Sequence, residues 1–124
     1  MTLIGFDVDG VLVCRGKLTI PPPHHLREGS PHFHVVVSGR TFQEYDGNIR
    51  ELAHRLPTYI RGSGEYGDRQ DAGRFKAMMV EVLGITDFYE DDPLQAEAIM
   101  VRNPLCNVVG VGPYFVGWKY DEAP

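Results

Sequence analysis

Short apolar runs alternate with longer stretches of helical periodicity along this chain. Runs that are apolar at nearly every position predict strands covered on both faces, as in a parallel sheet. Five such runs are rich in β-branched or aromatic residues, and they cover residues 3–6, 33–37, 58–60, 88–89 and 107–111. We therefore expect five strands in one sheet.

Three stretches between these runs have the spacing of amphipathic helices. They cover residues 42–56, 72–83 and 93–101, with Gly84 as a stop signal and Pro93 at a first helical position. The expected apolar stripe of the first is Tyr45, Ile49, Leu52, Ala53 and Leu56. That of the second is Phe75, Met78, Met79, Val82 and Leu83. The alternation predicts a three-layer α/β sandwich with a central, mostly parallel, five-stranded Rossmann-like sheet.

A proline-rich segment interrupts this alternation. Residues 21–23 are consecutive prolines, which exclude a strand interior and leave room for at most a short helix over 23–27. We expect one sheet face to be thinly covered as a result, which favours a homo-oligomer or a partner over that face. The aromatic tail 113–120 is expected to pack there, with stacking on unpaired bases as the alternative.

Length and composition limit the chain to one domain, residues 1–124, with a formal net charge of −5. We find neither a run of about 20 apolar residues nor a secretory pattern, and we expect a cytoplasmic protein that contacts no membrane. Cys14 and Cys106 have no metal-site spacing and are expected to be reduced thiols. The acidic balance argues against coating nucleic acid by bulk charge, although it leaves room for a small basic cleft.

The chemistry is expected beyond the carboxyl ends of the strands, where open α/β sheets bind ligands. The first strand is followed by Asp7 and Asp9, then by Gly10. Two carboxylates at this spacing share one face of a regular strand and repel each other unless a cation lies nearby or one is protonated. The alternative is an ordinary boundary between a strand and a turn.

Two further strands end in polar residues. Ser38, Gly39 and Arg40 follow the second strand, where a hydroxyl, a backbone amide and a guanidinium can bind phosphate oxygens. The alternative is that Ser38 or Thr41 simply caps the following helix. The fourth strand ends in the acids 90–92, an oxygen-rich cluster that suits Mg²⁺, although Asp92 can equally cap the next helix.

In their order along the chain, these features resemble the haloacid dehalogenase-like phosphatase superfamily. The sequence DVDGVL at residues 7–12 matches the first motif of the family, DxDGxx, and residues 35–38 match the second. Lys76 resembles the lysine of the third motif, and the pair 91–92 matches the acidic fourth motif. The resemblance covers residues 3–112 and is most specific in the first motif.

One branch of the superfamily has further points of similarity. The triplet 38–40, the loop Gly67-Asp68-Arg69 and the acidic pair 91–92 are similar to the 3′-phosphatase domain of polynucleotide kinases. This likeness implies a nucleic-acid terminal phosphate as the substrate.

The resemblance implies a role for each matched residue. Asp7 is expected to attack phosphorus and form an aspartyl-phosphate, while Asp9 acts first as general acid and then as general base. Ser38 and Lys76 are expected to contact the transferring phosphoryl group. The implied Mg²⁺ ligands are Asp7, Asp9 through its backbone carbonyl, Asp91 and, as an open question, Asp92.

Substrate-binding roles are expected for Gly39 and Arg40, at the end of the second strand, and for Arg69, in the loop after the third strand. The spacing leaves Arg69 and Arg74 as alternatives to Lys76 for the third-motif role.

The absence of a cap domain is expected from size. Family members that act on small metabolites usually carry a cap, but residues 10–33 and 39–75 are too few to hold one, since units below about 40 residues rarely fold alone. We therefore expect an open site for a macromolecular phosphate. The alternatives are a non-catalytic binding or regulatory module, a nucleotide phosphatase completed by oligomerisation and, less favoured, a receiver-type phospho-acceptor.

Overall fold

The computed structural model describes residues 2–18 and 32–112. The expectations for a helix over 23–27 and for the tail 113–120 lie outside the described residues.

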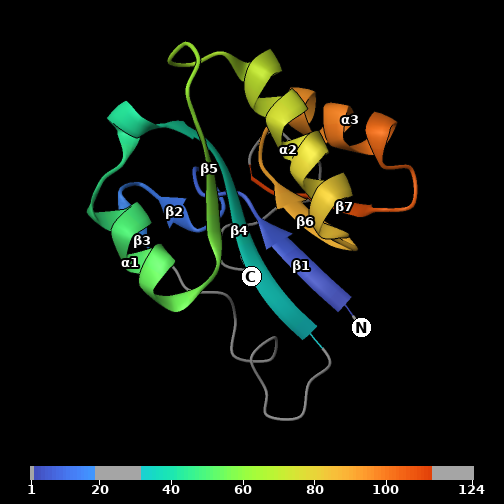
Figure 1. Cartoon of the computed structure of the whole chain (residues 1–124), viewed down its shortest axis with the longest axis horizontal. Helices are drawn as coiled ribbons and strands as arrows, with labels where there is room; N and C mark the ends of the chain where they lie inside the picture. Colours follow the sequence, from blue (N-terminus) through green and yellow to red (C-terminus); the bar gives the residue numbers. More distant parts are fainter. Residues whose placement is uncertain (1, 19–31, 113–124) are drawn as a thin grey trace.

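A five-stranded sheet whose neighbouring strands all pair in parallel forms the centre of the protein (Figure 1). Its strands are β1 (Thr2–Phe6), β4 (His32–Thr41), β5 (Thr58–Gly62), β6 (Asp87–Glu90) and β7 (Asn107–Gly110). The order across the sheet is β5-β4-β1-β6-β7. The five predicted strands and their parallel arrangement are confirmed, and β4 is longer than expected.

The strand order places a topological switch point at β1. The chain fills the sheet on the side of β4 and β5 first, then crosses to β6 and β7 on the other side of β1. The carboxyl ends of β1 and β6 therefore flank the crevice in which sheets of this type bind ligands.

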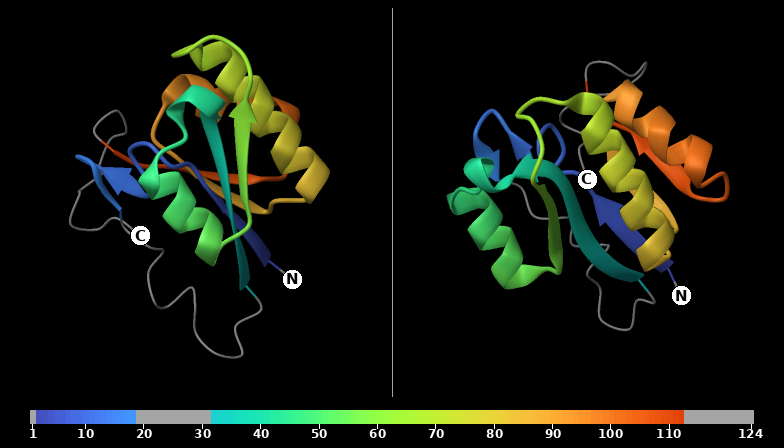
Figure 2. Two further views of the ribbon diagram at one scale, coloured as in Figure 1. Left: turned by 60° about the vertical axis from the view of Figure 1, so that its left-hand side comes forward. Right: turned by 45° about the horizontal axis from the view of Figure 1, so that its top comes forward.

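Helices cover both faces of the sheet, which confirms the predicted layered α/β sandwich (Figure 2). On one face, α1 (Gly47–Arg55) buries Ile49 and Leu52 against apolar residues of β1 and β4. On the other face, α2 (Arg69–Leu83) and α3 (Pro93–Arg102) pack on the sheet and on each other.

A two-stranded hairpin completes the α1 side of the core. Its strands are β2 (Val13–Cys14) and β3 (Lys17–Leu18), and the turn between them contains Arg15 and Gly16, both with positive φ. Val11 and Leu12, just before the hairpin, are buried in the same cluster as Ile49. Cys14 and Cys106 are not joined by a disulfide. In the part of the chain that is described, none of the helices has the length and apolarity needed to cross a bilayer.

The predicted helix over 42–56 is wrong in its first third. A short 3-10 helix, η2 (Phe42–Glu44), comes first, and α1 begins only at Gly47. The Asp46 carboxylate accepts hydrogen bonds from the backbone N–H groups of Asn48 and Ile49, so it caps a new helix. Tyr45 precedes this cap and is exposed, and Ala53 is exposed as well, so the predicted apolar stripe is wrong at both positions.

The second helix begins earlier than predicted and buries a different face. Asp68 caps it by accepting a hydrogen bond from the N–H of Asp71, so α2 starts at Arg69. The predicted stripe is wrong at Met78 and Val82, which are exposed. The buried residues are Ala72, Gly73, Lys76, Ala77 and Val80. Small side chains let α2 approach its neighbours: a Cβ at Gly73 would lie 3.1 Å from the Cβ of Ala98.

Candidate functional site

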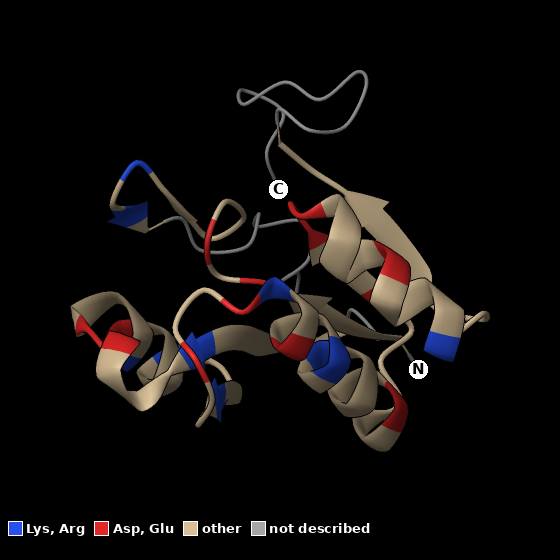
Figure 3. Ribbon diagram, turned by 90° about the horizontal axis from the view of Figure 1, so that it is seen from above, with Lys and Arg blue, Asp and Glu red and all other residues tan. Residues whose placement is uncertain are grey.

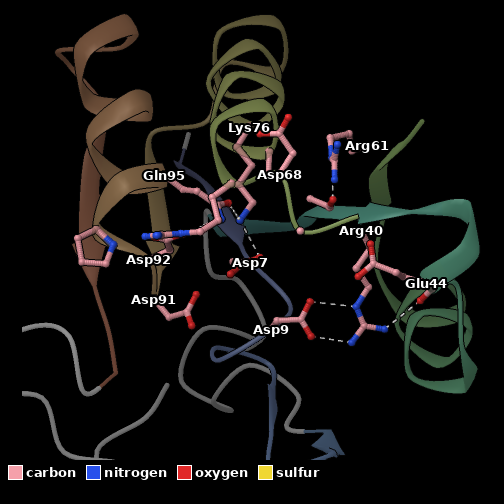
Figure 4. Close-up of a pocket in the computed structure, with 15 residues that line it drawn as sticks. Asp7, Asp9, Arg40, Glu44, Arg61, Asp68, Lys76, Asp91, Asp92 and Gln95 are labelled. Carbon is pink, nitrogen blue, oxygen red and sulfur yellow. Dashed lines mark hydrogen bonds and ion pairs between the residues drawn. The ribbon is translucent and has the colours of Figure 1, made fainter. Parts of the chain in front are cut away.

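A pocket of about 580 Å³ opens at the carboxyl edge of the sheet (Figure 4). Seen from above, acidic and basic positions of several elements gather around this edge (Figure 3). The charged residues lining the pocket are Asp7, Asp9, Arg40, Glu44, Arg61, Asp68, Arg69, Lys76, Asp91 and Asp92. Nearly all the residues predicted from the sequence to act together are therefore brought to one pocket.

Asp7 and Lys76 lie at the centre of the site. The backbone N–H of Asp7 donates to the carbonyl of Tyr89 at 3.0 Å, which extends the pairing of β1 and β6 and fixes Asp7 at the switch point. Lys76 Nζ lies 2.9 Å from Asp7 Oδ1 and 2.7 Å from Glu90 Oε1, and it donates to Gln95 Oε1 at 2.6 Å. Residues far apart in the sequence thus converge on one ammonium group.

The ammonium of Lys76 is almost fully buried, with 2% of the residue exposed. Burial alone would lower its pKa, but the charges of Asp7 and Glu90 outweigh this effect and raise the pKa above its usual value. Lys76 therefore stays a cation. Arg74, an alternative for its role, is exposed and lies 3.6 Å from Asp71.

Three carboxylates surround this single cation. Oxygens of Asp7, Glu90 and Asp91 lie within 4.8 Å of one another. Burial, followed by the charge of Asp7, raises the pKa of Glu90 well above its usual value and that of Asp91 to about 7. One ammonium cannot balance three carboxylates, so the cluster has the charge and the oxygen donors that suit a divalent cation.

Gly10 makes room for this cluster. Its φ is +81°, and a Cβ there would overlap the Asp91 carboxylate. Only a residue without a side chain fits both the backbone conformation and the approach of Asp91. The close approach of Asp91 therefore explains why position 10, the glycine of the DxDG sequence, has no side chain.

Asp9 points away from the acidic cluster and pairs with Arg40 (Figure 4). Arg40 donates through Nε and Nη2 to the two oxygens of Asp9, at 3.0 and 2.7 Å. Arg40 Nη1 lies 2.8 Å from Asp46 and donates to the carbonyl of Glu44 at 3.2 Å. The hydrogen bonds with Asp9 contribute most to raising the Arg40 pKa, so Arg40 is a fixed cation that orients a half-exposed Asp9.

Ser38 and Gly39 lie near the carboxyl end of β4, and only Gly39 reaches the pocket. Ser38 is fully buried, and its Oγ accepts a hydrogen bond from the N–H of Arg40 at 3.1 Å. It is not among the residues that line the pocket, whereas Gly39 is. A Cβ at Gly39 would lie 2.6 Å from that of Ala72, so Gly39 lets α2 approach β4 closely.

Asp92 has a structural environment unlike that of Asp91. It caps α3 by accepting from the N–H of Leu94 at 3.0 Å, and Arg69 binds both of its oxygens, at 2.8 and 2.6 Å. Arg69 is the main cause that lowers the Asp92 pKa to about 2. The structure thus places Asp92 at a helix cap and outside the acidic cluster, and it places Arg69 on Asp92, not on Asp7.

Arg61 connects three segments around the pocket. Its guanidinium donates to the carbonyl of Gly39 at 2.8 Å, to Asp71 at 2.7 Å and to the carbonyl of Glu65 at 2.9 Å. The side chain is only 4% exposed. It therefore ties the end of β4 to the loop after β5 and to the first turn of α2.

Sequence reasoning included Glu90 only as part of the acidic run 90–92, without a role of its own, and it missed Gln95. Glu90 carried a signal, because an acid at the end of an apolar strand is expected to be buried and to need a cationic partner. Gln95 lies three residues after Asp92 on α3, and its Nε2 donates to Asp92 at 2.9 Å. Gln95 lies about one helical turn after the cap residue Asp92, and this spacing could have predicted that the two side chains interact.

No protein-family description, curated protein or solved structure matches this chain.

Proposed function

We propose that this protein is a Mg²⁺-dependent phosphomonoester hydrolase that acts through an aspartyl-phosphate on Asp7. The observation that carries the proposal is the setting of Asp7, which lies at the switch point 2.9 Å from the buried ammonium of Lys76 and within the acidic cluster of Glu90 and Asp91. The DxDG resemblance of residues 7–10 agrees with this setting.

The nucleophile is the Asp7 carboxylate. It forms a bond to phosphorus as the bond between phosphorus and the leaving oxygen breaks. Asp9, protonated and turned from Arg40 toward the substrate, gives its proton to that oxygen. A water molecule then attacks phosphorus and transfers a proton to Asp9. Cleavage of the acyl-phosphate bond releases orthophosphate and restores the Asp7 carboxylate.

The proposed geometry assigns Lys76 and Arg40 to different tasks. Lys76 holds Asp7 in place and offsets negative charge as the phosphoryl group approaches. Arg40 orients Asp9 at the opposite side of the pocket, so the nucleophile and the acid are held by separate cations.

Mg²⁺ fits the donor set of the acidic cluster. Asp7 and Asp91 supply hard oxygen ligands, and Glu90 is engaged by Lys76 through one oxygen and by the N–H groups of Asp91 and Asp92 through the other. When bound, Mg²⁺ supplies the positive charge that lets an anionic nucleophile approach an anionic phosphate.

A macromolecular phosphate is the proposed substrate class, with a nucleic-acid 3′ end favoured. The pocket of about 580 Å³ opens at the edge of the sheet, and the short segments 10–33 and 39–75 support a site without a cap. A long chain can then present its terminal phosphate while the rest of it stays outside the pocket.

The test is phosphate release from a panel containing an aryl phosphate, nucleotides and 3′-phosphorylated oligonucleotides, with Mg²⁺ or EDTA. We expect Mg²⁺-dependent release that is lost in Asp7→Asn, with the 3′-phosphorylated oligonucleotide as the best substrate. Equal silence of the wild type and Asp7→Asn across the panel would favour the binding-module alternative.

A further inference from the structure

We propose that Phe42 and Tyr66 form a stacking platform for unpaired bases of a single-stranded nucleic acid whose terminal phosphate enters the pocket. The inference deepens the proposed function and rests on it, because it names how the chain beyond the phosphate is held.

The distribution of exposed aromatic residues supports this platform. Among the described residues, Phe42 and Tyr66 are the most exposed aromatics, at 72% and 78%. Phe42 belongs to η2, whose Glu44 lines the pocket, and Tyr66 directly precedes Gly67, which also lines it. The exposed aliphatic residues lie elsewhere, mainly on α2 and α3 and just beyond α3.

Phe42 is held in place although it is exposed. Ring atoms of Phe42 would lie 2.9 Å from a Cβ at Gly62, so the ring rests against the backbone at the end of β5. Contact with Gly62 leaves most of the ring surface open to solvent. A supported ring is what base stacking requires, since little side-chain freedom is then lost on binding.

Tyr66 is presented by an anchored turn. The N–H of Asp68 donates to the carbonyl of Glu65 at 3.3 Å, and Arg61 donates to the same carbonyl at 2.9 Å. Tyr66 therefore projects from a turn that is tied to the core. Figures 1 and 2 both show this loop and the segment of η2 at the carboxyl edge of the sheet.

Charge gives a second reason for stacking. The net charge of −5 opposes binding of a polyanion, and the pocket cations already face carboxylates: Arg40 faces Asp9, and Arg69 faces Asp92. Affinity for a nucleic acid must then come largely from contacts other than phosphate pairing. Aromatic stacking is the sequence-tolerant contact that unpaired bases offer.

Binding of a fluorescent single-stranded oligonucleotide tests the platform. Its 3′ end carries a methylenephosphonate, which cannot be hydrolysed, and a second probe lacks the bases of its last three nucleotides. In the presence of Mg²⁺ we expect Phe42→Ala and Tyr66→Ala each to weaken binding of the first probe by roughly 5-fold to 150-fold. Phe42→Leu keeps the apolar bulk without a ring, and we expect the same direction of change.

The chain offers matched controls for both variants. Phe33 is 54% exposed near the amino end of the same strand that precedes Phe42, and Tyr59 is 39% exposed on β5. Phe33→Ala and Tyr59→Ala are expected to bind within about two-fold of the wild type. The abasic probe is expected to bind weakly to the wild type and to be insensitive to Phe42→Ala.

The outcomes separate this proposal from the proposed function. Equal affinity of the wild type and both platform variants, equal binding of the two probes or equally tight binding of a phosphopeptide would overturn the platform. If any of these results is found and the protein nevertheless hydrolyses aryl phosphate, the proposed phosphatase activity is supported and only the platform is refuted. If base-dependent binding is found without any phosphate release, the platform stands and the phosphatase fails.

Discussion

Asp7 and Lys76 form an ion pair of 2.9 Å in which both residues are buried, and Lys76 also neutralises Glu90 at 2.7 Å. Removing a buried cation leaves its partners uncompensated, which is costlier than the pair itself is stabilising. Lys76 thus supports both the fold and the proposed nucleophile.

Replacement of Lys76 by methionine tests this double role. Lys76→Met keeps the volume of the side chain and removes its charge, so we expect the free energy of unfolding to fall by about 3–5 kcal/mol. Phosphate release is expected to fall at least about 100-fold. Arg74→Met, on the exposed face of the same helix, is the control and should change stability by less than about 0.5 kcal/mol in urea titrations. Equal stability of the two variants would contradict the account.

Mg²⁺ is expected to stabilise the folded protein through the acidic cluster. At a concentration of 100 times Kd, a ligand that binds only the folded state adds about 2.7 kcal/mol, which thermal denaturation detects. Asp91→Asn removes one ligand and one charge of the cluster and should abolish most of the Mg²⁺ response. Glu97→Gln, an exposed acid on α3, should keep it. A response of equal size in Asp91→Asn would place the metal elsewhere.

Substitutions at two glycines with similar backbone angles distinguish the cost of backbone strain from the cost of a steric clash with Asp91. Gly10 and Gly16 have φ of +81° and +76°, but only at Gly10 would a Cβ meet the Asp91 carboxylate, since Gly16 has open space around it. We expect Gly16→Ala to cost about 1–2 kcal/mol from backbone strain alone. Gly10→Ala should cost more and should also weaken the Mg²⁺ response, as urea and thermal denaturation can measure. Identical behaviour of the two variants would refute a steric role for Gly10.

The pair of Arg61 and Asp71 predicts a pH dependence of stability. The hydrogen bond from Arg61 is the main cause that lowers the Asp71 pKa below its usual 3.8. A depressed pKa stabilises the fold at pH above 3.8, and this contribution is lost as the pH falls through the folded-state pKa.

Asp71→Asn is therefore expected to be less stable than the wild type at pH 6, with a difference that shrinks below pH 3.8. Urea denaturation at several pH values measures this difference, and Glu97→Gln serves again as the exposed control. A difference that stays constant, or that grows on acidification, would show that Arg61 does not act through Asp71.

The gathering of polar residues at the carboxyl edge of the sheet was largely predictable from the sequence. Asp7 and Lys76 meet because parallel strands end at one edge and because a helix following the third strand returns over it. The convergence of Lys76 on Glu90 was not predictable, since the sequence does not show which side of α2 faces the sheet. Small residues such as Gly73 and Ala77 set that face, and they have little weight in a hydrophobic pattern.

The assignments of Arg40, Arg69 and Asp92 show a second limit. Each was expected near phosphate or metal, but guanidinium–carboxylate pairs join Arg40 to Asp9 and Arg69 to Asp92. Which arginine pairs with which carboxylate depends on how side chains from different strands, loops and helices are oriented. The position of a residue at the end of a strand does not define this orientation. The interruption between η2 and α1 could have been predicted from the sequence, because Asp46 is a residue type that commonly caps the start of a helix.

Capture of the phosphoryl group on Asp7 tests the central claim most directly. In Asp9→Asn the second step lacks its general base, while an aryl phosphate has a leaving group that needs no proton for the first step. Intact-protein mass spectrometry of this variant, incubated with aryl phosphate and Mg²⁺, is predicted to show one added phosphoryl group that maps to Asp7. The group should be absent from the double variant that also carries Asp7→Asn. A label on another residue, or turnover that survives Asp7→Asn, would contradict the account.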